Sequence, residues 1–341
     1  MKLLLLAWPA VLLGLAAGVV SSALAAQSLS GRATAPVNVR QRVLYVWDST
    51  IPGDVARTDR LLCFSERKGI TTLAIEASPV GYLEPFADAD YARFVDAAHD
   101  RGLSVLALGG SPWFTVAADA ALPGQPSLQE EGWFLYENIA LSGLFDGVLD
   151  NSMPHLTTYT SGGITHNYFW EDLPNAAQDY LDWLDGVDAV IGNLPFYHAT
   201  PFWFDSDARL ASLLLDGQAQ PHTLAWYVAG SVDVVNFLAY RDDVYSILDA
   251  VDGELARGPC IVGIETQDRG PLLDYTTFFE EGGPRMDAEL GLVQRTLQDD
   301  PHYLGISYHY YGSYVSMPGV TPHPGSTPRG RFRRPGTPIA R

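Results

Sequence analysis

Three titratable side chains fall at the ends of short apolar segments, where strands are expected to give way to loops. Glu76 closes the segment 71–77, Glu265 closes 261–266, and His309 follows 303–308. Carboxylates and imidazoles commonly transfer protons in enzymes, and two carboxylates in different surroundings can divide the acid and base roles. Burying an unpaired charge is costly, so each acid needs a partner or a function. A structural ion pair with an arginine is therefore the alternative interpretation for Glu265.

These side chains need a scaffold that brings several strand ends together. Apolar segments recur along the chain, each followed by polar or aromatic residues and then by apolar residues at helical spacing. We predict strands at 43–47, 71–77, 104–108, 144–149, 189–193, 232–239, 261–266 and 303–308. Eight strand-then-helix units predict an α/β protein with one (β/α)8 TIM barrel and extended loops at its C-terminal mouth. A doubly wound open sheet is the alternative, but the GxGxxG loop of its dinucleotide-binding forms is absent after the first strand.

Side chains alternate between the two faces of a strand, so the sequence also predicts which residues face the mouth. The inward sets are Thr72, Ala74 and Glu76; Gly147, Leu149, Asn151 and Met153; Gly263, Glu265 and Gln267; and Gly305, Ser307, His309 and Tyr311. Asp150 faces the helices if the fourth strand is regular. A β-bulge would turn Asp150 into the mouth, and a helix-capping role is its other interpretation.

The stretch FDGVLDNSMPH at 145–155 carries a resemblance to a known group. Its start, Asp146-Gly147, resembles the DGxxxDxE strand-four motif of secreted TIM-barrel glycoside hydrolases of the chitinase-like group and related bacterial proteins. Tyr240 is similar to the tyrosine of the strand-six motif in that group, which holds a substituent of the sugar. The resemblance implies a strand-four glutamate that protonates the leaving oxygen. Asn151 and Met153 occupy the acid positions here, so the motif is degenerate.

Two main interpretations follow. The first is a secreted glycoside hydrolase that cleaves extracellular polysaccharide by carboxylate acid/base catalysis, with Glu265 as nucleophile or base and Glu76 or Asp150 as acid. The second is an inactive barrel that binds carbohydrate, and a structural envelope protein is a third possibility. The candidate catalytic residues are Glu265, Glu76, Asp150, Tyr240 and His309. The candidate substrate-binding residues, which are rings or hydrogen-bonding groups expected at strand ends, are Trp47, Asp48, Trp113, Asn151, His155, Tyr197, Arg241, Asp242, Gln267 and Tyr311.

The ends of the chain and its charge bear on location and partners. Residues 1–26 combine Lys2 with a long apolar run that ends in Ala-Leu-Ala, which is typical of a signal peptide, with a retained anchor as the alternative. We predict a linker at 27–41, the barrel at 42–317 and a disordered basic tail at 318–341. The protein is thus expected outside the cell or attached to its envelope. A formal charge of −19 argues against nucleic acid as a partner, and a poly- or oligosaccharide is expected instead.

No pattern in the sequence predicts a cofactor or a metal. His155 and His198 are isolated, whereas a zinc site needs three or four converging ligands. A GxSxG serine-esterase motif is also absent. For Cys63 and Cys260 we expect two buried apolar thiols, with a disulfide between them as the alternative.

Overall fold

A computed structural model of the protein describes residues 40–77, 88–117 and 128–321. These residues belong to one compact unit, Arg40–Arg341. The predicted signal peptide, almost all of the linker and most of the basic tail lie outside the described residues, so the predicted domain boundaries stay predictions.

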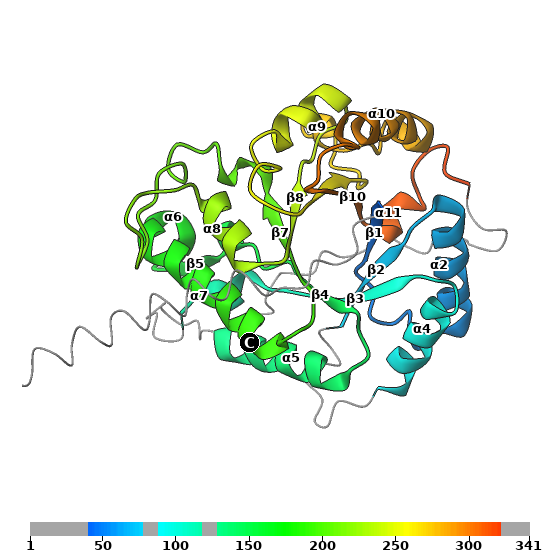
Figure 1. Ribbon diagram of the computed structural model, residues 1–341, viewed down its shortest axis with the longest axis horizontal. Coiled ribbons are helices and arrows are strands. Elements are labelled where there is room, and N and C mark those ends of the chain that lie inside the picture. The colour runs from blue at the N-terminus through cyan, green and yellow to red at the C-terminus, as the bar shows by residue number, and fades with distance from the viewer. Residues whose placement is uncertain (1–39, 78–87, 118–127, 322–341) are drawn as a thin grey trace, which may run out of the picture. The chain divides into compact units, whose positions relative to one another are not determined.

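Eight parallel strands close into a barrel, with helices around the outside (Figure 1). Around the ring the strands are β1 (Gln41–Val46), β10 (Tyr303–His309), β9 (Cys260–Glu265), β8 (Val234–Leu238), β7 (Phe196–Pro201), β4 (Gly147–Asp150), β3 (Ser104–Gly109) and β2 (Thr72–Glu76). The prediction of a (β/α)8 barrel is confirmed. Because all eight strands are parallel, their C-terminal ends meet at one mouth.

The helices of the outer ring follow the strands in turn. They are α2 (Val55–Lys68), α4 (Ala89–His99), α5 (Gln129–Ser142), α7 (Leu173–Ile191), α8 (Leu224–Ser231), α9 (Val244–Val251) and α10 (Gly282–Leu297), with short α6 (Tyr168–Glu171) and α11 (Tyr311–Tyr314). In α2, the side chain of Asp54 accepts from the N–H of Arg57 at the start, and Gly69 ends the helix at a φ of 61°. That left-handed backbone favours glycine. Local sequence signals therefore set both ends of this helix.

The fifth barrel strand lies later in the chain than its predicted place at 189–193. Those residues overlap the end of α7, a helix in which Val187 and Ile191 are both buried. Two apolar residues four positions apart lie on one face of a helix, so the apolar run belongs to a helical stripe. The strand begins instead at Phe196, after a break at Gly192.

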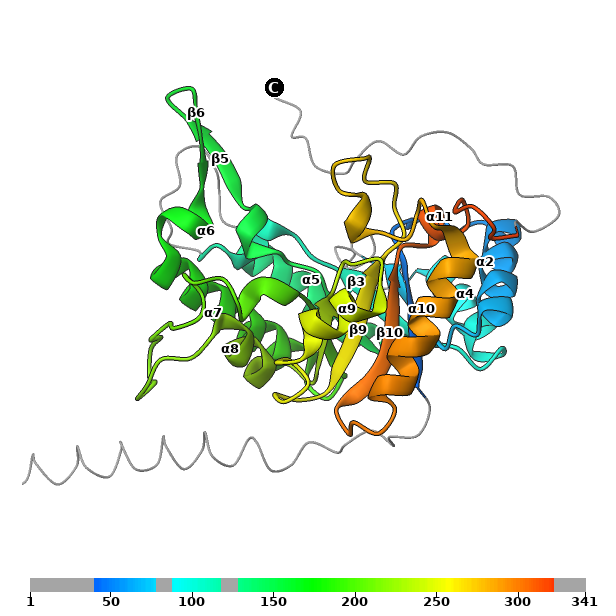
Figure 2. The same cartoon turned by 90° about the horizontal axis from the view of Figure 1, so that it is seen from above.

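The long segment after β4 carries additional structure at the mouth. β5 (Thr158–Ser161) and β6 (Ile164–Asn167) pair as an antiparallel hairpin outside the barrel sheet. Figure 2 shows this hairpin projecting beyond the ring of helices. Short 3₁₀ turns follow three other strands and β4 itself: η1 (Pro112–Thr115), η2 (Pro154–Leu156), η3 (Phe202–Phe204) and η4 (Asp274–Thr276). Extended loops at the mouth were predicted from the sequence.

The buried apolar side chains divide into two sets according to strand face. The set that fills the barrel includes Tyr45, Ala74, Leu149, Met153 and Ile261. Residues at the alternate positions of the same strands, such as Leu44, Leu73, Val148 and Val262, pack between the strands and the helices. The predicted alternation is therefore confirmed along β1, β2, β4 and β9.

Membrane and cysteine features can be stated for the described residues. Within 40–77, 88–117 and 128–321, no helix combines the length and apolar character needed to cross a membrane. Cys63 and Cys260 are both free thiols. Cys260 is fully buried and Cys63 is half-buried, so the disulfide alternative is wrong and one thiol is less buried than expected.

One buried acid in the turn after α9 makes stability sensitive to pH. Glu254 is only 1% exposed. Burial, assisted by Asp205, raises its pKa to about 8, although Arg257 lies 3.2 Å away and opposes the rise. A carboxyl whose pKa is higher in the folded protein stabilises the fold while it is protonated. That contribution is lost as the pH rises from the pKa of this carboxyl in the unfolded protein toward its folded pKa of about 8.

We expect the melting temperature of the parent protein to fall between about pH 5 and about pH 8. Glu254→Gln should remove most of this fall and melt above the parent at the higher pH. Thermal unfolding followed by circular dichroism at both pH values measures the effect. Glu137→Gln, at an exposed position of α5, is the matched control and should behave as the parent. A parent melting temperature that is the same at both pH values contradicts this account.

Candidate functional site

Glu265 is the last residue of β9, and its carboxylate lies at the mouth and is fully buried. Its Oε1 accepts from the backbone N–H groups of Thr266 at 2.8 Å and Gln267 at 2.9 Å. Nδ1 of His309 lies 3.2 Å from both carboxylate oxygens. The guanidinium of Arg269 lies 3.5 Å from Oε2. Both oxygens are therefore engaged, and the arginine pair considered from the sequence is present beside the mouth.

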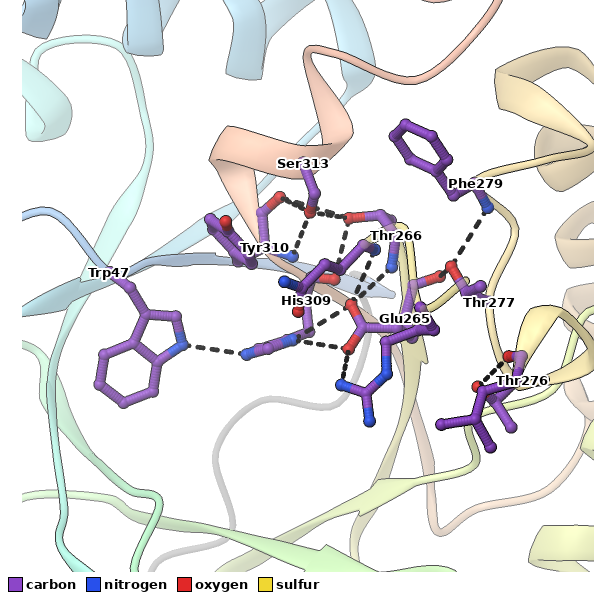
Figure 3. A network of polar contacts seen from close by, with 12 residues as sticks. Trp47, Glu265, Thr266, Thr276, Thr277, Phe279, His309, Tyr310 and Ser313 are labelled. Carbon is purple, nitrogen blue, oxygen red and sulfur yellow. Dashed lines mark hydrogen bonds and ion pairs between the residues drawn. The ribbon is translucent and has the colours of Figure 1, made fainter. Parts of the chain in front are cut away.

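His309 ends β10 and connects Glu265 to an aromatic ring. The indole Nε1 of Trp47, just beyond β1, lies 3.1 Å from Nε2 of His309. An indole N–H can only donate, so Nε2 must accept and the ring proton of a neutral imidazole sits on Nδ1. Nδ1 then donates to Glu265. Figure 3 shows indole, imidazole and carboxylate in series, which fixes both the orientation and the tautomer of His309.

Tyrosine rings surround this imidazole. Tyr240 stacks on His309 with ring centroids 6.0 Å apart, and the rings of Tyr45 and Tyr310 each lie 5.4 Å from it. Burial, assisted by the charge of Glu265, raises the pKa of Tyr240 well above its ordinary value. Uncharged aromatic rings therefore lie around the hydrogen-bonded series of Glu265, His309 and Trp47.

Glu76 is the last residue of β2, which pairs with β1 on the side opposite β10. Its side chain is only partly buried. Burial raises its pKa; the N–H of Ser49 opposes the rise, and the charge of Asp48 adds to it. Asp48 itself is paired with Arg57. A carboxyl with a raised pKa keeps its proton closer to neutral pH, which suits a proton donor.

Asp150 lies on the face of β4 that packs against the helices, and not on the face toward the barrel interior. β4 pairs in continuous register with β3 and β7, so the bulge that would have turned Asp150 inward is absent and that prediction was wrong. Its carboxylate accepts from the Tyr136 hydroxyl at 2.7 Å and from Trp183 Nε1 at 3.3 Å, both from helices. Met153, not Asp150, precedes the first residue of η2, so the capping interpretation was wrong too.

The pKa of Asp150 reflects these contacts. Burial would raise the pKa, but the hydrogen bond and charge of His198, whose Nδ1 lies 2.9 Å away, bring it below its ordinary value. Ser152 and Tyr136 contribute in the same direction. Asp150 and His198 are both fully buried. This pair joins the neighbouring strands β4 and β7 and is closed to solvent.

Two candidate binding residues lie elsewhere than predicted. Tyr197 is the second residue of β7, and its hydroxyl accepts from Gln41 at the first position of β1, so it lies at the end of the barrel opposite the mouth. The misplaced fifth strand explains that error. Tyr311 begins α11 directly after β10, and its ring packs against Phe64 of α2 at 5.4 Å. Alternation stops where the strand ends, so the predicted inward direction of Tyr311 was wrong.

Other candidates line the loops around the mouth. Trp113, in η1, packs against the core between strands and helices. His155, in η2, contacts the ring of Trp203 at 5.0 Å, and burial lowers its pKa to about 4. Asn151 follows β4, and its N–H bonds to the carbonyl of Gly109. These residues are near strand ends, but none contacts the Glu265 series.

Arg241 and Asp242 follow β8, next to Tyr240. Arg241 donates to the carbonyl of Tyr240 at 2.7 Å, and its guanidinium lies 4.4 Å from the ring of Phe202. It therefore links the loops after β7 and β8. Burial raises the pKa of Asp242, with nearby Asp243 contributing.

Sequence reasoning did not single out Arg269, Tyr45 or Asn236. Arg269 lies four residues after Glu265, a spacing that could have suggested the pair. Tyr45 precedes Trp47 by two positions and so shares its strand face; its hydroxyl bonds to the amide of Asn236 inside the barrel. In the part of the chain that the structure describes, no cluster of three or more His, Cys, Asp or Glu side chains is arranged to hold a metal ion.

No protein-family model matches this chain, and no curated protein matches it. Among solved structures, it is similar to a chitinase from Rhizomucor miehei, with 15% identity, a TM-score of 0.47 and coverage of 80% of this chain and 95% of that one. It is also similar to a GH113 beta-1,4-mannanase at 13% identity and a TM-score of 0.49, covering 80% and 89%. The Bacillus cereus spore cortex-lytic enzyme SleL shows 11% identity and a TM-score of 0.48, covering 82% and 72%. These likenesses are at low identity and concern the fold alone, and barrels of this kind host many unrelated activities.

Proposed function

We propose that the mouth of this barrel binds an oligo- or polysaccharide. The observation that carries the proposal is the series Glu265, His309 and Trp47, which holds a large half-exposed ring at the mouth through one directed hydrogen bond. The rings of Tyr240 and Tyr310 contact His309 and add aromatic side chains beside this series. Sugars combine apolar faces with hydroxyl groups, so rings with polar edges suit them.

The expected ligand is uncharged or weakly charged. The chain has a formal charge of −19, which disfavours nucleic acid and other polyanions. We also propose that the protein acts outside the cell, on the basis of the apolar leader at residues 1–26. The N-terminal sequence of protein recovered from the culture medium tests the location, and a protein confined to the cell would contradict it.

Trp47→Ala is expected to weaken oligosaccharide binding about tenfold or more, because it removes a central aromatic contact. The measurement is calorimetric titration with soluble oligosaccharides derived from chitin, mannan and glucans. Trp226→Ala is the matched control, since Trp226 is 42% exposed on α8 and stacks on His222 instead. Equal affinities for the parent and Trp47→Ala would place the binding site elsewhere.

A second candidate function is hydrolysis of the bound glycan, and the raised pKa of Glu76 favours it. Glycoside hydrolases use one carboxyl as acid and a second as base or nucleophile. In this proposal Glu76 donates the proton. Glu265 was expected to be the nucleophile or base, but its burial and its full set of donors mean that it would have to give up the bond to His309 to reach a sugar or a water molecule. Binding without cleavage therefore ranks first.

A further inference from the structure

We propose that Glu265 and His309 are positioning residues for Trp47, and that they hold its indole at the mouth only while the imidazole is neutral. The contacts are those of the series in Figure 3. The inference rests on the proposed function, in which Trp47 contacts the sugar. It adds a reason for carbohydrate affinity to depend on pH.

The donor and acceptor roles of Trp47, His309 and Glu265 allow only one arrangement of protons on the imidazole. Trp47 donates to Nε2, so that nitrogen carries its lone pair toward the indole. Protonation of His309 places a hydrogen on Nε2 as well as on Nδ1. Two N–H groups then face each other, and the hydrogen bond to Trp47 is lost. The Nδ1–H group keeps its bond to Glu265, which becomes an ion pair.

Three tyrosine rings and two charged side chains lie around the imidazole. The rings that face it are Tyr45, Tyr240 and Tyr310, and burial raises the pKa of all three, so they stay uncharged there. The charged groups beside it are the carboxylate of Glu265 and the guanidinium of Arg269. Histidine is the side chain that ordinarily titrates between about pH 5 and about pH 8.

This bond is a directed contact that sets the orientation of the Trp47 indole, which also packs against the apolar cluster inside the barrel. The indole is half-buried beyond the end of β1, and the ring of Tyr45 is tilted relative to it, with ring centroids 6.3 Å apart. Protonation of His309 therefore removes the contact that orients the indole, while its apolar packing stays in place. Affinity for the sugar is expected to be lower when His309 is protonated.

The test follows the indole N–H signals of the full chain in which tryptophan carries ¹⁵N. Trp47→Phe identifies the Trp47 signal among the eight indoles. In the parent, that signal should move in one step as pH falls from about 8 to about 5. In Glu265→Gln the step should lie at lower pH, because the amide still accepts from Nδ1 but no longer stabilises the imidazolium. The Trp203 and Trp226 indoles, which pack against His155 and His222, should behave alike in both proteins.

A Trp47 signal that stays constant across this range, or a step at the same pH in parent and Glu265→Gln, overturns the proposal. His309→Gln provides a second readout, since its amide does not titrate and should leave the Trp47 signal independent of pH. Titration with chitin- and mannan-derived oligosaccharides separates the two claims. A pH-dependent Trp47 signal without any binding contradicts the proposed function alone. Binding with a pH-independent Trp47 signal contradicts the positioning role alone.

Discussion

Asp150→Ala is expected to lower the free energy of unfolding by about 3–5 kcal/mol, the usual cost of removing one partner from a buried ion pair. The substitution leaves His198 without its carboxylate, and it removes the acceptor for Tyr136 and Trp183. All of these groups are fully buried, so water cannot replace the lost partner. Urea unfolding followed by circular dichroism measures the change.

The matched control is Asp150→Asn, which keeps the shape and one acceptor oxygen and should cost less. Because the pKa of Asp150 is lower in the folded protein, its contribution is present above the ordinary value of 3.8 and is lost as pH falls through the folded value. The stability difference between parent and Asp150→Asn should therefore shrink in acid. A loss below about 0.5 kcal/mol for Asp150→Ala, within the range of ordinary surface changes, would contradict a structural role.

Glu76→Gln is expected to reduce glycan hydrolysis by about 10²–10⁴-fold if the protein cleaves its ligand, because that is the usual contribution of a general acid. Glutamine has the same shape but cannot release a proton, so oligosaccharide binding should stay within a few-fold of the parent. The measurement is release of reducing ends from the glycan that binds most tightly. Unchanged turnover in Glu76→Gln would remove this residue from the reaction.

The pH dependence supplies an independent check on Glu76. The protonated form is the active one for an acid, so the rate should decline as pH rises through the raised pKa of Glu76. Asp48→Asn removes a negative charge that contributes to that rise, and the decline should begin at lower pH in this variant. A decline at the same pH in both proteins would show that another group sets it.

The alternation of side chains along a strand was enough to predict the position of the central residues. Glu76, Glu265 and His309 each end a strand whose bounds were predicted to within one residue at each end, and they lie at the mouth, where the parallel strands end. Asp150 faces the helices, as a regular pleat requires. These successes share a cause, since a period of two leaves little freedom once one residue of a strand is placed.

The errors arose where the period itself was ambiguous or ended early. A short apolar run such as 189–193 fits both a strand and one turn of a helix, and the error carried Tyr197 to the wrong end of the barrel. The contacts between side chains of different strands could not be predicted from the sequence for a different reason. The bond between Trp47 and His309 joins residues 262 positions apart, and it depends on the register between neighbouring strands.

The central claim is that the mouth around Trp47 binds carbohydrate. Titration of the ¹⁵N-indole signals with soluble oligosaccharides tests it most directly. We expect at least one oligosaccharide to shift the Trp47 signal to saturation while leaving the Trp226 signal on α8 unchanged. If an oligosaccharide binds and the Trp47 signal does not move, or if none of the oligosaccharides binds, the claim is contradicted.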